Sequence, residues 1–278
     1  MQTFQTSQGH RLTYSTMGQP ENPPIIMIHG WFSHRGVWET TMQHYAEHHY
    51  CIAIDLLGFG ESNKPSTNEY TIEAQAKRVL ELIDNLGFDQ FILVGHSMGG
   101  MISLYIAAEL APDRVIKVVS VAGVVTNRLH RRVEWLAYPL VALTYYAPIV
   151  GRITNYLSQY RWAAHSVFRS WFYKMDNPPF DTWAKDRWYA TNDQMSNSGY
   201  WAGQAIHHMD LTDRLKQIKA PTLAIFGKQD GTVHVSDGRL VDEQVPDSSL
   251  ALIDQCGHFP MYEQPDAYLR AMGEFITP

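Results

Sequence analysis

Short apolar runs alternate with longer mixed segments along most of the chain. An uninterrupted apolar run that ends in glycine or a polar residue is typical of a parallel strand covered on both faces. Runs of this kind occupy residues 24–30, 51–58, 91–96, 115–123, 222–227 and 250–255. Their alternation with helical segments predicts an α/β fold, with a mostly parallel central sheet flanked by helices.

Two further segments fit this picture. In "TIEAQAKRVLELIDNLG", residues 71–87, apolar residues recur at helical spacing and Gly87 suits a helix end, so the pattern predicts a helix. The first segment, "QTFQTSQGHRLTYSTMG", residues 2–18, predicts a hairpin at the sheet edge.

The alternation of strand-like and helical segments stops between residues 124 and 210, where no run resembles a strand and aromatic residues are frequent. This pattern predicts a mainly helical cap, inserted after the sixth strand, while residues 1–123 and 211–278 form the core. The rings of this segment are Trp135, Tyr138, Tyr145, Tyr146, Trp162, Phe168, Trp171, Phe172, Tyr173, Trp183, Trp188, Tyr189 and Trp201.

Composition narrows the class of protein and its partners. With 278 residues, 45% hydrophobic and 18% charged, the chain can bury a sizeable core, as a soluble globular protein does. A formal net charge of -6 offers no basic field, so nucleic acid is not an expected partner. The N-terminus lacks a secretory pattern, and two cysteines suit a reduced compartment, so we expect the protein in the cytoplasm.

One uncharged segment needs a membrane test. "WLAYPLVALTYYAPIVG", residues 135–151, contains two prolines and is short for a membrane span. We therefore predict a buried or interface-facing helical segment here, with no stable membrane insertion.

The motif "GHSMG", residues 95–99, places Ser97 between a predicted strand and a helix-compatible run. A strand that turns abruptly into a helix holds its central residue in strained geometry, and the flanking glycines remove Cβ atoms that would clash. Helix N-terminal N–H groups would stabilise negative charge beside the hydroxyl. The motif predicts a nucleophile in Ser97, the alternative being a helix cap.

A serine nucleophile needs a base, and the base needs a group that orients it. Asp230 follows the predicted strand at 222–227, and His258 follows the one at 250–255. Both residues therefore lie at strand ends, where they can meet Ser97.

Five motifs occur in a fixed order: "IIMIHGW", "AIDLLGFGES", "LVGHSMGG", "PTLAIFGKQD" and "CGHFPMYEQP". With them, the chain resembles the α/β-hydrolase superfamily of serine esterases and lipases over almost its full length. The resemblance implies that Ser97 attacks, His258 acts as general base and Asp230 orients the imidazole. It implies no metal and no organic cofactor.

The resemblance also implies an oxyanion hole, made by the backbone N–H groups of Met98 and Trp31. His29 and Gly30 would shape the loop that carries Trp31. His96 is expected to pack or hydrogen-bond in the turn rather than act as the base. Asp55, at the end of the strand in "DLLGFGES", is expected to fix the following turn.

Several other residues have structural interpretations. His44 and His48 are four residues apart in a predicted helix, but no cysteine or carboxylate cluster completes a site, so no metal is predicted. Cys256 is expected to be a packed thiol. The basic run "NRLHRR", 127–132, predicts a solvated helix face or a site for a substrate anion, and "MDNPPF", 175–180, a hinge or a turn.

The predicted function is hydrolysis of small-molecule carboxylic esters with apolar, short to medium acyl chains. Three alternatives stay open on this fold: a carbon–carbon bond hydrolase of ring-fission products, a perhydrolase or haloperoxidase-like enzyme, and a ligand receptor. Carbon–carbon hydrolases commonly carry tryptophan after the catalytic histidine, where this chain has Phe259. A homodimer through the cap is a candidate assembly.

Overall fold

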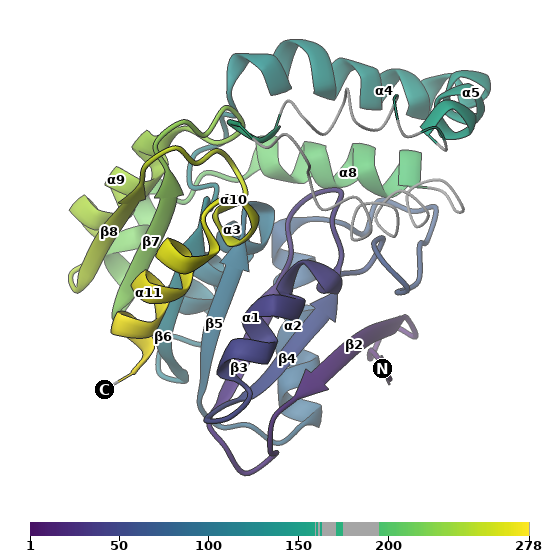
Figure 1. Cartoon of the computed structure of the whole chain (residues 1–278). Helices are drawn as coiled ribbons and strands as arrows, with labels where there is room; N and C mark the ends of the chain where they lie inside the picture. The colour runs from purple at the N-terminus through teal and green to yellow at the C-terminus, as the bar shows by residue number, and fades with distance from the viewer. Residues whose placement is uncertain (159, 161, 163–170, 175–194, 278) are drawn as a thin grey trace.

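The structure, a computed structural model, describes residues 1–158, 160, 162, 171–174 and 195–277. These residues form one eight-stranded sheet of order β1-β2-β4-β3-β5-β6-β7-β8 (Figure 1). The first two strands pair antiparallel with each other and β2 with β4, whereas the remaining pairs are parallel, which confirms the edge hairpin. The strands are β1 Gln2–Gln5, β2 Arg11–Met17, β3 Pro24–Ile28, β4 Tyr50–Asp55, β5 Phe91–His96, β6 Val115–Val121, β7 Thr222–Gly227 and β8 Ser248–Ile253.

Helices cover both faces of the sheet, and successive residues of β3 show why its sequence is uninterruptedly apolar. Ile26 and Ile28 belong to the core on the face covered by α2, α3 and α9, and Ile25 and Met27 to the core on the face covered by α1 and α11. The helices and single turns of this layer are η1 Arg35–Trp38, α1 Glu39–Tyr45, α2 Ile72–Asn85, α3 Met98–Tyr105, η2 Ile106–Leu110, η5 Thr212–Gln217, α9 Val235–Gln244, α10 Pro260–Glu263 and α11 Pro265–Ile276.

Four predicted strands were too long at their carboxyl ends. The structure ends β3 at Ile28, β4 at Asp55, β6 at Val121 and β8 at Ile253, although the predicted runs continue for two or three more residues. After β3, β4 and β6 these extra residues are buried loops at the carboxyl edge of the sheet, whereas the two after β8 are exposed turn residues. Because these loops are buried, they are held in fixed positions at the edge of the sheet where the candidate site lies.

The described residues of the predicted insertion are largely helical. They form η3 Val133–Ala137, α4 Tyr138–Tyr146, α5 Pro148–Ser158 and α8 Met195–His208, and α8 lies between α4 and the sheet (Figure 1). Stacked rings join the two layers, as in Tyr145 on Tyr200, whose centroids are 4.3 Å apart. The role of this segment as a cap stays a prediction. Phe168, Trp183, Trp188, Tyr189 and the segment 175–180 lie outside the described residues.

A buried carboxylate fastens the start of this segment to the core. Asp237 on α9 accepts hydrogen bonds from the backbone N–H groups of Val125 at 2.8 Å and Thr126 at 3.1 Å. Burial raises the pKa of the Asp237 carboxyl, and the hydrogen bonds oppose that shift. The chain therefore leaves β6 in a fixed direction.

The segment 135–151 is not buried, which corrects one of the two expectations for it. Trp135 is 74% exposed and Ile149 is 69% exposed. Among the described residues, no single helix is long and apolar enough to cross a bilayer; only the pair Val133–Tyr146 and Pro148–Thr154, bent by 120°, passes a test of length and composition.

Candidate active site

Ser97 occupies the turn between β5 and α3 with a φ of 54° and a ψ of -116°. This backbone region is costly for any residue with a Cβ atom, so the surroundings must impose it. The Ser97 N–H donates to the Val121 carbonyl at 2.9 Å, and its carbonyl accepts from Val124 N–H at 3.2 Å. Ser97 itself is 7% exposed. The strand-turn-helix context predicted for the motif is present.

The glycines of the motif are required by close backbone packing. A Cβ atom on Gly95 would lie 2.1 Å from the Gly99 carbonyl oxygen, and one on Gly99 would lie 2.1 Å from the Ile28 carbonyl oxygen. Each approach is far inside van der Waals contact. Helix α3 therefore starts directly against β5 and β3, with Ser97 at the point of contact.

His258 and Asp230 meet at the ends of β8 and β7. His258 Nδ1 lies 2.9 Å from Asp230 Oδ2, and both side chains are buried. The other carboxylate oxygen accepts from Thr232 N–H at 2.8 Å and Val233 N–H at 3.1 Å. Because Asp230 accepts the Nδ1 proton, the lone pair of neutral His258 is on Nε2.

His96 joins the strand before Ser97 to the loop of His258. Its Nε2–H donates to the His258 carbonyl at 2.8 Å, and the two imidazole centroids are 4.7 Å apart. Burial, and to a lesser extent the neighbouring His258, hold the pKa of His96 well below its ordinary value. His96 is thus a neutral hydrogen-bond donor in the turn, as expected, and it ties the backbone of His258 to the strand end that precedes Ser97.

The loop after β3 packs on Ser97. A Cβ atom on Gly30 would lie 2.9 Å from the Ser97 Cβ, so only glycine fits there. His29 donates from Nδ1 to the Gly30 carbonyl at 2.7 Å and accepts at Nε2 from Leu56 N–H at 3.1 Å, a tautomer assigned from these partners. His29 and Gly30 therefore give the loop its shape.

The two residues expected to supply the oxyanion hole, Met98 and Trp31, lie on different elements. Met98 is the first residue of α3, and its N–H belongs to the first turn, which has no intrahelical acceptors. Trp31 follows Gly30, and its indole Nε1–H donates to the Gly199 carbonyl of α8 at 2.8 Å. The loop is thereby tied to the helix above it.

Glu263 is a site residue that the sequence did not reveal. Its carboxylate accepts from the N–H groups of Gly257 at 3.0 Å, Phe259 at 3.2 Å and Tyr173 at 2.8 Å, so it brackets His258. Burial raises the pKa of Glu263, and these three donors oppose the shift. The available signal was Pro260, which starts the short helix that turns Glu263 back toward His258.

Asp55 fixes the turn after β4, as expected. Its carboxylate accepts from Arg35 N–H at 2.7 Å and Glu61 N–H at 2.9 Å, and it pairs with the Arg35 guanidinium. Each oxygen of this buried group is therefore engaged in holding two loops together rather than being free for chemistry.

Metal ligation and cysteine chemistry find little support in this structure. Within the described ranges, no group of three histidine, cysteine or acidic residues could hold a metal ion. Helix α1 ends at Tyr45, so the predicted helix carrying both His44 and His48 is wrong. Cys256 is buried, and burial raises the pKa of its thiol, as suits a packed side chain.

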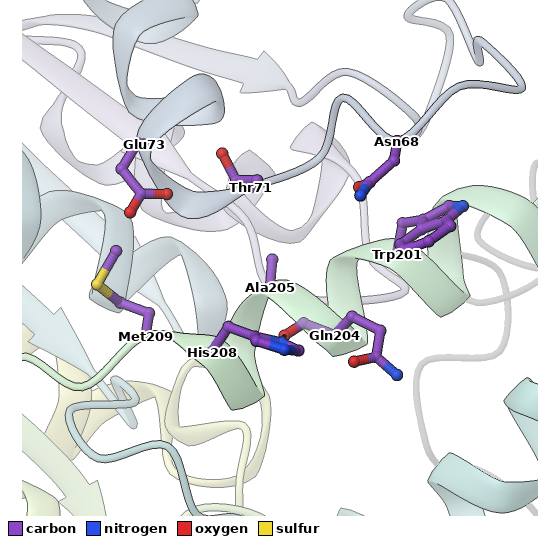
Figure 2. A pocket seen from close by; sticks show the side chains of 8 residues that line it. All are labelled: Asn68, Thr71, Glu73, Trp201, Gln204, Ala205, His208 and Met209. Atoms are coloured by element: carbon purple, nitrogen blue, oxygen red, sulfur yellow. Dashed lines mark hydrogen bonds between the residues drawn. The ribbon is translucent and has the colours of Figure 1, made fainter.

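Several cavities are lined by the described residues. One, of about 330 Å³, lies between α8 and the start of α2, and Figure 2 shows its polar side chains, Glu73 and His208 among them. A second, of about 210 Å³, is lined by Leu136 and Leu140 of the cap and by Gly231, the neighbour of Asp230. This second cavity adjoins the candidate site through Gly231, and another, of about 270 Å³, adjoins it through Glu263.

Comparison with known proteins identifies the family of this fold. The model of the α/β hydrolase fold family matches residues 23–265, most of the chain. The chain belongs to the α/β hydrolase fold family. Two relatives from this comparison are the 2-hydroxy-6-oxo-2,4-heptadienoate hydrolase of Pseudomonas putida and Lipase 1 of Psychrobacter immobilis.

The first relative is 26% identical over 269 residues, covering 91% of this chain and 89% of that protein. The lipase is 26% identical over 267 residues, covering 94% of this chain and 78% of that protein. The solved enol-lactonase of Burkholderia xenovorans shares the α/β hydrolase fold with a TM-score of 0.82 at 22% identity, covering the full length of both chains. Together with the family model, the two relatives support a hydrolase and leave the bond it cleaves undecided.

The neutral state of His29 predicts a pH dependence of stability. Burial lowers the pKa of His29 to about 4, against about 6.5 in an unfolded chain. Above about pH 6.5 the neutral side chain contributes fully, and this contribution is lost as the pH falls toward 4, because only the unfolded state takes up the proton. At pH 5 the loss is about 2 kcal/mol.

The variant His29→Gln cannot take up this proton. Urea titrations should therefore show that, between pH 7 and pH 5, the unfolding free energy of the parent protein falls by about 2 kcal/mol more than that of His29→Gln. An equal fall in both proteins would contradict a neutral, buried His29.

The contacts of Glu263 predict a local loosening when its charge is removed. In Glu263→Gln, one carboxylate oxygen becomes an amide group that cannot accept a hydrogen bond, so at least one of the amides of Gly257 and Phe259, which donate to different oxygens, should exchange at least about tenfold faster in deuterium oxide. Glu274→Gln, an exposed change on α11, is the control. Unaltered protection at both amides would show that Glu263 does not hold the loop.

Proposed function

We propose that the protein is a serine hydrolase that cleaves carboxylic esters through Ser97, His258 and Asp230. The observation that carries the proposal is the buried Asp230–His258 hydrogen bond of 2.9 Å beside the strained turn of Ser97. The family and the hydrolase relatives support the general reaction class. The roles of the individual residues are argued from the contacts below.

In the first half of the reaction, Ser97 Oγ attacks the ester carbonyl while His258 Nε2 takes its proton. Asp230 stabilises the imidazolium that forms and keeps the ring in orientation through Nδ1. The protonated His258 then gives its proton to the leaving alcohol, which leaves an acyl group on Ser97. In the second half, His258 deprotonates a water that attacks this acyl group and releases the acid.

The hydroxyl of Ser97 contributes no hydrogen bond among the described residues, whereas His258 is already held by Asp230. This is compatible with the mechanism, because catalytic hydrogen bonds often tighten only when substrate is bound. The developing oxyanion would bind to the N–H groups of Met98 and Trp31. The first benefits from the positive end of the α3 dipole.

The surroundings of His258 favour an apolar acyl group. Phe259 stacks on Phe172 with centroids 5.1 Å apart and on Trp171 at 6.1 Å. Trp31 adds a further ring on the opposite loop, against Tyr138 at 6.4 Å. These aromatic side chains would bury a hydrocarbon chain but would not pair with a charged acyl group. We therefore infer a preference for apolar, short to medium acyl chains.

A second candidate is hydrolysis of a carbon–carbon bond in a ring-fission product. The relative from Pseudomonas putida is named for that type of substrate, and a serine triad would serve both reactions. Phe259, where tryptophan is common in those enzymes, is the observation that ranks ester hydrolysis first.

A nitrophenyl-ester series run beside a ring-fission substrate separates these candidates. We expect kcat/KM to peak at short to medium acyl chains, to be low for the ring-fission substrate, and to fall at least about a thousandfold in Ser97→Ala. Ser236→Ala, which changes an exposed serine on α9, is the matched control and should keep the activity of the parent protein.

A maximum at charged or very long acyl groups would overturn the inferred acyl preference. Faster turnover of the ring-fission substrate would favour the second candidate. Full ester hydrolysis in Ser97→Ala would exclude the mechanism itself.

A further inference from the structure

The outer face of the cap helices exposes an apolar surface that the reaction does not use. We define the cap face as the outward side chains of η3, α4 and α5, the outermost layer above α8 (Figure 1). Its exposed large hydrophobic residues are Trp135, Leu136, Leu140, Leu143, Ile149, Ile153, Tyr156 and Leu157. Large exposed apolar patches on soluble proteins mark sites of interaction with proteins or membranes.

Charges border the cap face without interrupting it. Exposed Arg131 and Arg132 lie at its start, and exposed Arg152 lies on α5. The single acidic residue between positions 124 and 158, Glu134, accepts from Leu129 N–H at 2.8 Å and lies 3.7 Å from His207 Nε2. The border is therefore positive, although the whole chain has a formal net charge of -6.

We propose that the cap face docks on the surface of a bilayer that contains anionic lipid. Tryptophan and tyrosine beside leucine and isoleucine, with arginine at the border, is the composition of helices that lie in the headgroup region. The two helical segments are bent by 120° to each other, which suits lying on a surface rather than crossing it. Arginine side chains would pair with the phosphates of the headgroups.

A second copy of this chain fits the cap face less well. In a two-fold dimer the same surface meets itself, so the arginines at both ends of the face would oppose arginines of the other copy. Glu134, the one acidic residue among positions 124–158, is already engaged by Leu129 N–H and lies near His207, so it would not compensate the repulsion. The charge pattern therefore favours lipid headgroups over a homodimer through the cap.

The cap face is continuous with the cavity beside the candidate site. Leu136, 71% exposed, and Leu140 belong to both, and the cavity reaches Gly231 next to Asp230. Docking would place this opening against the lipid, so an apolar ester dissolved in the bilayer could reach Ser97 without crossing water. This last step rests on the proposed esterase function; docking itself does not.

The test is sedimentation with vesicles of phosphatidylcholine containing about one third phosphatidylglycerol. The intact protein should bind, and Leu143→Glu combined with Ile149→Glu should weaken binding at least about tenfold, because two exposed apolar side chains that would enter the lipid become charged. Neither residue lines the cavity. Ile116→Glu, an exposed apolar position on β6, is the matched control and should bind like the parent protein.

A second variant tests the charge argument. Arg131→Gln combined with Arg152→Gln should weaken binding to these vesicles about tenfold or more and leave binding to pure phosphatidylcholine unchanged. If the intact protein fails to bind vesicles, the proposal is overturned. If it also forms a dimer in light scattering that Leu143→Glu with Ile149→Glu dissociates, the face is an interface between copies.

Activity measurements separate this proposal from the proposed function. With a nitrophenyl decanoate dissolved in vesicles and a water-soluble nitrophenyl butyrate, Leu143→Glu with Ile149→Glu should lower the first rate at least about tenfold and retain the second. Ser97→Ala should still bind vesicles. If the parent protein hydrolyses the soluble ester but does not bind vesicles, docking alone is contradicted. If it binds vesicles but hydrolyses neither ester, the esterase alone is contradicted.

Discussion

Close backbone contact at the start of α3 is the constraint on which the candidate site depends. Helix α3 touches β5 through Gly95 and Gly99, and the loop after β3 touches Ser97 through Gly30. With no side chains between them, the three elements converge on one residue, and Ser97 is left with a positive φ. The parallel sheet makes this possible, because its buried strands hold the backbone of β3 and β5 in register on both sides.

The electrostatic arrangement follows from that packing. In so buried a place an unpaired charge is costly, so polar groups are either neutral or fully engaged. Burial keeps His29 and His96 neutral, and each uses ring nitrogens to bind a neighbouring loop. Asp230 is engaged by two backbone N–H groups and by His258. The proposed base is thus held in one orientation before any substrate arrives.

The sequence allowed much of the fold and the candidate site to be predicted, for reasons that are local. Residues at the carboxyl ends of parallel strands share one edge, which brought Asp230 and His258 together at the edge where the turn of Ser97 lies. The ends of β3, β4 and β6 were overestimated because buried loops are as apolar as strands. Glu263 was missed because its partners are backbone N–H groups, which no residue type reveals, and Pro260 indicates only the start of the short helix. The exposure of the segment 135–151 could not be predicted either, because helix periodicity does not reveal what covers a face.

The most direct test of the central claim is covalent labelling with a fluorophosphonate, followed by intact mass measurement and peptide mapping. The phosphonyl group forms a bond only with a serine activated by a base. The account predicts one added group per chain, on the peptide that contains Ser97, and none in Ser97→Ala. A label on another serine, or labelling that persists in Ser97→Ala, would contradict it.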